Sequence, residues 1–177
     1  MAEKPPHRAR GIPLGRRELD ETLFLALRAV YLFERSKVER FELSFEEIYL
    51  LQYLRRSSPA KMSAIAGEMG IPVSTATRLV TRMCRMRLVN RWRDEADRRI
   101  VNVSLTDNGE AAVSAVERHT YEVVSRNVRR FTSEDIAAFI KTAQCLGDIL
   151  GAVPVPRPKA AGGRNRSRVR NAKEDGG

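Results

Sequence analysis

Hydroxyl and guanidinium side chains share one face of a short segment that the sequence predicts to be a helix, about 73–87. At a helical period this face carries no acid, and its members are Ser74, Thr75, Thr77, Arg78, Thr81, Arg82 and Arg85. Such groups suit phosphate oxygens and major-groove base edges, where one bidentate Arg on guanine contributes roughly 1 to 3 kcal/mol of discrimination. A solvated face normally mixes both signs of charge, so this face favours an anionic partner. A merely soluble basic helix is the alternative.

A second group of candidate residues lies at the tip of a predicted hairpin. Apolar and polar residues alternate over 101–105, the period of a half-buried strand, after the charged segment 94–99. Arg98 and Arg99 in such a tip can enter a minor groove, whose negative potential deepens where the groove narrows. Asp97 can hold Arg99 in position through a charge-assisted hydrogen bond. The alternative is a solvated turn with internal ion pairs.

Two short amphipathic helices and this hairpin are the elements that must position both groups. Apolar residues recur at spacings of three and four on either side of Gly70; they are Ile65, Ala66, Met69, Ala76, Leu79, Val80 and Met83. Gly70 suits a tight turn because it takes a positive φ without a Cβ clash, and the small Ala66 lets the second helix cross closely. This order of elements predicts a winged helix-turn-helix.

Longer helical patterns flank that unit. The first covers 19–38 and is apolar on more than one side. Ser44 and Glu47 form a capping box that opens a helix ending near Ser57. After the hairpin, Thr106 and Thr132 can cap helices that run to about 130 and 150. These apolar helices exceed what one winged helix needs, which favours a twofold dimer with recognition helices roughly 34 to 36 Å apart. Completion of a monomeric core is the alternative.

Taken in order, these residues resemble the multiple antibiotic resistance regulator (MarR) family of winged helix-turn-helix transcription factors. The matching runs are Ile65-Ala66, Met69-Gly70-Ile71, Ser74-Thr75-Ala76-Thr77-Arg78-Leu79, Leu88-Val89-Asn90-Arg91, Asp97-Arg98-Arg99 and Leu105-Thr106-Asp107-Asn108-Gly109. The resemblance implies a homodimer that binds pseudo-palindromic double-stranded DNA, usually as a repressor relieved by a small ligand that the sequence does not identify. It also implies that Arg99 enters the minor groove. The residues implied to face the major groove are Ser74, Thr75, Thr77, Arg78 and Arg82.

The resulting fold class is mainly α with a small β-hairpin, a winged helix-turn-helix flanked by long dimerisation helices. The expected divisions are a flexible basic arm (1–17), an N-terminal dimerisation helix (18–43), the winged helix-turn-helix (44–106), C-terminal dimerisation helices (107–152) and a disordered basic tail (153–177). Within the DNA-binding unit, the recognition helix covers about 73–87 and the wing about 88–105.

Two positions depart from the family pattern at the ends of the recognition helix. Pro72 stands where a Ser N-cap is common, and loss of such a cap costs typically about 1 kcal/mol. Arg87 stands where members commonly carry a Gly that takes a left-handed turn. Either Arg87 is strained or the helix ends differently.

The charge distribution agrees with a nucleic-acid partner. The chain has 32 Lys and Arg against 22 Asp and Glu, a formal net charge of +10. Between 61 and 99 nine basic residues face four acidic ones, and between 154 and 177 seven face two, a net of +5 in each. An architectural DNA-coating protein without sequence preference, and an interaction module that has lost DNA binding, are the two alternatives from other classes.

Other chemistry has few carriers in this sequence. No nucleophile triad spacing, Gly-rich phosphate loop or paired-His metal motif appears, which predicts no enzyme and no cofactor. Cys84 and Cys145 are too few for a zinc motif or a disulfide framework. Cys84 is expected to be a buried thiol, Trp92 to pack against the core of the winged helix, and His119 to be a polar residue on a helix or dimer face.

Localisation is predicted from what the chain lacks. No apolar run approaches the roughly 20 residues of a membrane span. Residues 1–17 lack the apolar core of a signal peptide. The sequence therefore predicts a cytoplasmic protein with no membrane partner.

Overall fold

The computed structural model describes residues 14–152, so the predicted basic tail and most of the predicted N-terminal arm lie outside the described residues. Its elements are α1 (Arg16–Phe41), α2 (Phe45–Ser57), β1 (Ala60–Lys61), α3 (Met62–Glu68), α4 (Val73–Arg85), β2 (Val89–Arg93), β3 (Val101–Leu105), α5 (Asp107–Asn127), a 3₁₀ turn (Val128–Arg130), α6 (Ser133–Gln144) and α7 (Leu146–Ile149). None of these helices has the length and apolar character needed to cross a membrane.

The helix N-termini form where the sequence predicts caps. Ser44 accepts a hydrogen bond from the Glu47 amide, and the Glu47 carboxylate accepts one from the Ser44 amide at 2.8 Å, which completes the capping box of α2. The Thr106 hydroxyl accepts a hydrogen bond from the amide of Gly109 at the start of α5. Thr132 caps α6 in the same way, so all three predicted caps are confirmed.

The hairpin is part of a three-stranded antiparallel sheet in the order β1-β3-β2. β2 and β3 pair from Val89 opposite Leu105 to Arg93 opposite Val101. β1 adds a third strand through Ala60 opposite Val103. The sequence predicted only the hairpin because a strand of two residues is too short to show alternation.

The core lies within the winged helix and the first half of α5. In the part of the chain that the structure describes, every buried apolar side chain falls between Leu43 and Val116. Helix α2 contributes Ile48, Leu51 and Leu54 to it, all almost fully buried. Most of the core therefore lies within the predicted unit 44–106, and Val113 and Val116 of α5 complete it.

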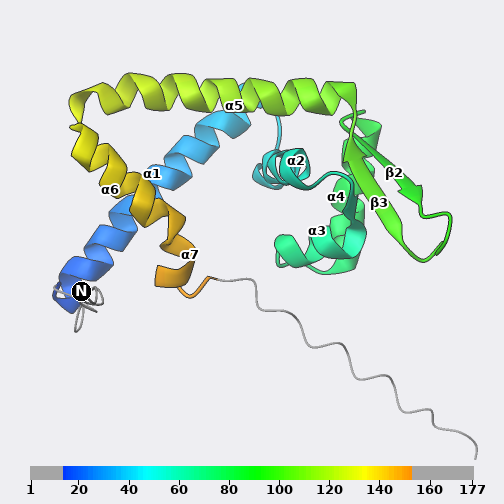
Figure 1. The fold of residues 1–177 in the computed structure, drawn as a ribbon, viewed down its shortest axis with the longest axis horizontal. Coiled ribbons are helices and arrows are strands. Elements are labelled where there is room, and N and C mark those ends of the chain that lie inside the picture. The colour runs from blue at the N-terminus through cyan, green and yellow to red at the C-terminus, as the bar shows by residue number, and fades with distance from the viewer. Residues whose placement is uncertain (1–13, 153–177) are drawn as a thin grey trace, which may run out of the picture.

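The remaining helices form an arm, defined here as residues 16–41 and 117–150. α5 runs from the winged helix at one end to α6 at the other. In the view of Figure 1, α1 and the winged helix lie on the same side of α5. Large apolar side chains are exposed along this arm: Leu23, Phe24, Leu25, Leu27, Val30, Tyr31, Leu32, Tyr121, Val124, Phe131, Phe139, Ile140, Leu146, Ile149 and Leu150. The expected burial on several faces of α1 is thus not met within one chain.

The predicted helix from 132 to 150 is wrong in that it is interrupted after Gln144. α6 ends there, and Cys145 separates it from the short α7. Gly147 lies within α7, where glycine weakens a helix by about 1 kcal/mol relative to alanine.

Candidate nucleic-acid interface

The turn between α3 and α4 is set by the end of α3. The Ile71 amide donates to the Ala66 carbonyl at 3.0 Å, and the Gly70 amide to that of Gly67 at 3.2 Å. This Schellman pattern needs a left-handed residue after the cap, and Gly70 has φ +64°. Ala66 is buried where the two helices meet, so the predicted roles of Gly70 and Ala66 are confirmed.

α4 buries its apolar side and leaves the candidate polar face accessible. Ala76, Val80 and Met83 are fully buried, while Ser74 and Arg78 are exposed. Thr75 and Thr77 are half-buried. The face accordingly offers hydroxyls and guanidiniums to a partner, as the periodicity predicts.

Local hydrogen bonds hold several of these side chains. Arg78 Nη2 lies 3.4 Å from the Thr75 hydroxyl, a long hydrogen bond within one turn. The Thr77 hydroxyl donates to the Val73 carbonyl at 2.8 Å. This bond leaves the lone pairs of the Thr77 hydroxyl as acceptors for an external donor.

Arg82 lies differently from its neighbours on α4. Its Nε is 2.9 Å from Oε1 of Glu47, a fully buried residue of α2, whereas the Arg82 side chain is 63% exposed. The predicted contact face thus loses one guanidinium, at least in part, to a pair inside the winged helix.

The wing tip holds Arg99 by a two-pronged contact. Arg99 Nε and Nη2 donate to the two carboxylate oxygens of Asp97, each at 3.0 Å, and the Arg99 amide also donates to Asp97. The Arg99 guanidinium, followed by its amide, holds the pKa of Asp97 below its usual range. The Arg99 side chain remains 90% exposed, so it is oriented by Asp97 and still accessible. The predicted Asp97–Arg99 contact is confirmed.

Asp94 shapes the tip and escaped the sequence prediction. Its Oδ1 accepts hydrogen bonds from the Ala96 and Asp97 amides, and these bonds hold its pKa below the usual value. The Ile100 carbonyl accepts from the Asp94 amide and closes the loop. An Asp whose carboxylate accepts the amides two and three residues later forms an Asx turn. The Asp at the start of a charged loop was therefore the signal that the sequence offered. Arg98 is exposed in this loop.

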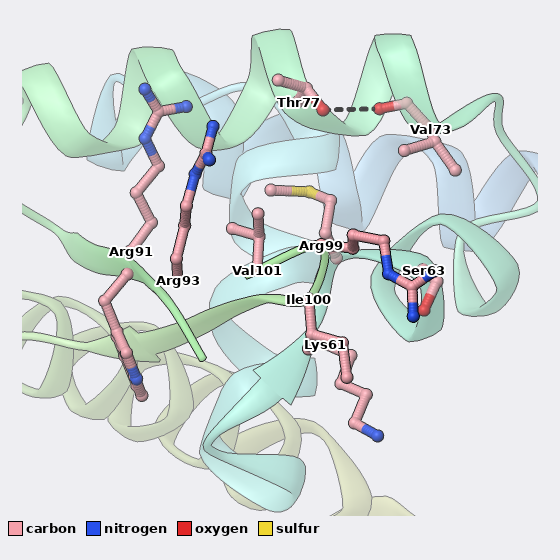
Figure 2. Close-up of a pocket in the computed structure, with 11 residues that line it drawn as sticks. Lys61, Ser63, Val73, Thr77, Arg91, Arg93, Arg99, Ile100 and Val101 are labelled. Carbon is pink, nitrogen blue, oxygen red and sulfur yellow. Dashed lines mark hydrogen bonds between the residues drawn. The ribbon is translucent and has the colours of Figure 1, made fainter. Parts of the chain in front are cut away.

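A cleft of about 540 Å³ separates the wing from the N-terminal half of α4. Arg91 and Arg93 extend from β2 toward α4, as Figure 2 shows. Arg91 donates to the Thr81 hydroxyl at 3.0 Å and thereby links the wing to α4. Trp92 lines the cleft, is 42% exposed and does not belong to the core cluster, so the expectation that it packs against the core is wrong.

The remaining candidates for other chemistry have ordinary surroundings. His119 contacts Phe41 edge-on with ring centroids 5.8 Å apart, which ties α5 to α1. Cys84 is half-buried against the core. Across residues 14–152, no three His, Cys, Asp or Glu side chains converge as a metal site would require.

Comparison with known proteins decides the family. A model of the MarR family matches residues 43–101. The uncharacterized HTH-type transcriptional regulator YsmB of Bacillus subtilis is 31% identical over 108 residues, which cover 61% of this chain and 74% of YsmB. The chain belongs to the MarR family. It is accordingly a transcriptional regulator of the helix-turn-helix class rather than an enzyme.

Solved structures of the MarR family share this fold. FabT from Streptococcus pneumoniae, crystallised in complex with DNA, gives a TM-score of 0.68 at 22% identity and covers 78% of this chain and 99% of FabT. A MarR family protein from Bacillus stearothermophilus gives 0.69 at 23% identity, with the same coverage of 78% and 99%. At these identities the likeness establishes the fold.

The predicted recognition helix, α4, begins without a side-chain cap. Pro72 is the N-cap residue of α4 and supplies no side-chain hydrogen bond. Its carbonyl accepts from the amides of Thr75 and Ala76. The predicted weak cap is therefore confirmed, and the first turn keeps amides that point outward from the helix end.

The other end of this helix resolves the question about Arg87. α4 ends at Arg85, with Met86 as C-cap, so it is shorter than the predicted 73–87. Arg87 has φ +58° and occupies the left-handed position of a second Schellman motif. In that motif the Leu88 amide donates to the Met83 carbonyl at 3.0 Å. Arg87 thus adopts the conformation that the usual glycine would, and is strained.

Three hydrogen bonds made by Thr106 at the start of α5, here called the Thr106 lock, hold the strained backbone between α4 and β2 in place. The Thr106 hydroxyl donates to the Arg87 carbonyl at 2.6 Å and accepts from the Gly109 amide at 3.0 Å. The Thr106 amide donates to the Leu88 carbonyl at 3.1 Å. The Leu-Thr-x-x-Gly run of the family pattern therefore joins the recognition helix, the wing and α5 at one point.

Replacement of Arg87 by glycine is expected to stabilise the protein. A left-handed conformation costs a non-glycine residue about 1 to 2 kcal/mol, partly offset by the greater freedom of glycine when unfolded, so a gain of about 1 kcal/mol is expected. Urea unfolding measures the gain. Arg87→Ala is the matched control, because it removes the same charge and keeps the strain; equal stability of the two variants would contradict the assignment.

Proposed function

We propose that this regulator acts as a homodimer on pseudo-palindromic DNA, as a repressor, with α4 in the major groove and the wing tip in the minor groove. One observation carries the proposal: an acid-free face of hydroxyls and guanidiniums on α4 stands beside an exposed Arg99 that Asp97 already orients. Arginine prepositioned in this way suits insertion into a narrow minor groove, because little side-chain freedom remains to be lost on binding.

The proposed contacts divide between the grooves. Ser74, Thr75, Thr77 and Arg78 contact base edges and nearby phosphates from α4. Arg98 and Arg99 contact the minor groove and its flanking phosphates. The uncapped first turn of α4 adds outward amides that favour a phosphate. FabT, whose fold this chain shares, was crystallised with DNA, which supports this use of the fold.

The distribution of burial supports the dimer. The winged helix and the first half of α5 bury every fully packed apolar residue of the described chain, whereas the arm exposes Leu27 at 67% and Phe139 at 70%. Exposed apolar residues continue over α1, α5, α6 and α7. Exposed apolar surface of this extent is typical of an association site, and a twofold partner would present the same surface in return.

Relief of repression is assigned to a small ligand bound between the arm and the winged helix. An apolar groove of about 540 Å³ lies there, between α1 and the start of α2, and is lined by Leu27, Val30, Tyr31, Glu34, Arg35, Val38, Ser44 and Phe45. A ligand that binds one dimer geometry more tightly shifts the population toward it by that difference in affinity and no more.

Selection of genomic fragments by the purified protein, followed by binding assays on the recovered site, tests the DNA assignment. Arg78→Ala is expected to weaken binding to the selected site roughly ten- to hundredfold and to relax the preference at one base pair of each half-site. Arg99→Ala is expected to weaken binding mainly to sites with a narrow A·T flank, so that replacing this flank by G·C pairs affects the wild type more than the variant.

Arg118→Ala is the matched control, because it removes one exposed cation from α5 outside the two proposed contact groups. Equal affinities for selected and random DNA would favour an architectural protein that coats DNA. Unchanged binding in both Arg78→Ala and Arg99→Ala would indicate that α4 and the wing do not contact DNA.

A further inference from the structure

The pair formed by Glu47 and Arg82 joins the helix before the helix-turn-helix to the recognition helix itself. We infer that this pair is a positioning contact: Arg82 sets the rotation of α4 through Glu47 and does not act by touching phosphate. The inference rests on the proposed use of α4 in the major groove. Its starting observation is the 2.9 Å separation between Arg82 Nε and Glu47 Oε1.

Glu47 divides its two carboxylate oxygens between two tasks. Oε2 accepts the Ser44 amide and completes the cap of α2. Oε1 is fully buried and accepts no hydrogen bond, so the nearby charge of Arg82 is what compensates it. A buried carboxylate without compensation is strongly unfavourable, which holds the guanidinium of Arg82 toward α2.

The apolar contacts of α4 set its rotation only coarsely. Ala76, Val80 and Met83 keep the apolar side of the helix toward the core, but their contacts are non-directional and tolerate a small rotation. A rotation by a fraction of the step of about 100° between successive helical residues would already displace the side chains presented to DNA. A charge pair with one fixed, buried partner resists such a rotation because it would separate Arg82 from Glu47.

α2 is also tied to α5 at its other end. Arg55 forms ion pairs with Glu110 and, at 4.0 Å, with Glu117 of α5. The same helix is therefore paired with the recognition helix near its start and with the arm near its end. Through the Glu47–Arg82 contact, a movement of α2 would change the orientation of α4.

A double-mutant cycle tests this role with Glu47→Gln, Arg82→Met and the double variant. Glutamine keeps a carbonyl oxygen for the capping box, so Glu47→Gln removes the charge and preserves the cap. Each single variant is expected to lose about tenfold in affinity for the selected site, and the double variant no more than either one. The slope of log affinity against log salt is expected to stay at the wild-type value in all three, because no phosphate contact is lost.

A direct phosphate contact by Arg82 gives the opposite pattern and would overturn the inference. Arg82→Met would then lower the salt slope by about 0.9, and Glu47→Gln would leave affinity unchanged. Additive losses in the cycle would overturn it as well. Should a single variant fail to fold, the double variant, which buries no unpaired charge, and the conservative Arg82→Lys supply the comparison.

Failure of the proposed function gives a separate result. In that case the wild type selects no site, and the cycle is read by urea unfolding alone. Non-additive losses of stability would then show that Glu47 and Arg82 interact across α2 and α4. Additive losses would show that the two residues are not coupled.

Discussion

Gly109→Ala is expected to destabilise the protein by about 3 kcal/mol or more, a large effect for the addition of one methyl group. A Cβ on Gly109 would lie 2.0 Å from the Leu88 carbonyl oxygen and 3.2 Å from Leu105 Cδ2. The Leu88 carbonyl cannot yield easily, because it already accepts the Thr106 amide at the corner between α4 and β2. Relief of the clash would separate α5 from the wing. Urea unfolding followed by circular dichroism measures the loss.

Gly67→Ala provides the matched control. Gly67 lies within α3, and nothing stands within 4 Å of the position its Cβ would occupy. Alanine there is expected to stabilise the protein by about 0.5 to 1 kcal/mol, because it favours the helix and restricts the unfolded chain. Equal stability of the Gly109→Ala and Gly67→Ala variants would show that the backbone between α4 and β2 tolerates a methyl group on Gly109. The Thr106 lock would then contribute little to stability.

Phe139→Asp is expected to convert the proposed dimer into monomers and to weaken binding to the selected site at least about a hundredfold, because two linked half-site contacts become independent events. Phe139 is 70% exposed in one chain and lines an apolar cavity of about 620 Å³ with residues of α1 and α5. A carboxylate there would be desolvated only in the dimer. Sedimentation at micromolar concentration and DNA titration measure the two effects.

Lys141→Asp controls for the new carboxylate, because residue 141 lies on the opposite side of α6 from residue 139. The secondary structure of Phe139→Asp should persist, since the core between Leu43 and Val116 belongs to one chain. A wild type that sediments as a monomer at micromolar concentration and still binds its site tightly would contradict the dimer.

Local patterns explain which features could be predicted. The capping box at Ser44 joins residues three apart, and Asp97 reaches Arg99 over two. The Gly70 turn also depends on neighbouring residues, so each of these features can be recognised from spacing alone. The family resemblance added the left-handed position that Arg87 occupies, which no periodicity shows.

Contacts distant in sequence account for what was missed. β1 exists only because Ala60 lies opposite Val103. Trp92 alternates along β2 with Arg91 and Arg93, which extend toward α4, so Trp92 lies on the other side of the strand. Both outcomes depend on how separate elements pack. Residue type and local spacing do not distinguish a two-residue strand from a loop, and they do not tell which side of β2 faces α4.

The sequence by itself determined the order of the helices and hairpin, the polar face of α4 and the clamp on Arg99, because these follow from helical period, strand alternation and contacts within a few residues. Only the tertiary structure decided that Arg82 turns toward Glu47, 35 residues earlier, and that Gly109 meets the Leu88 carbonyl. The reason is physical: the partner of a charge or of a close backbone contact is chosen by the packing of whole elements, which brings together residues that no local pattern connects.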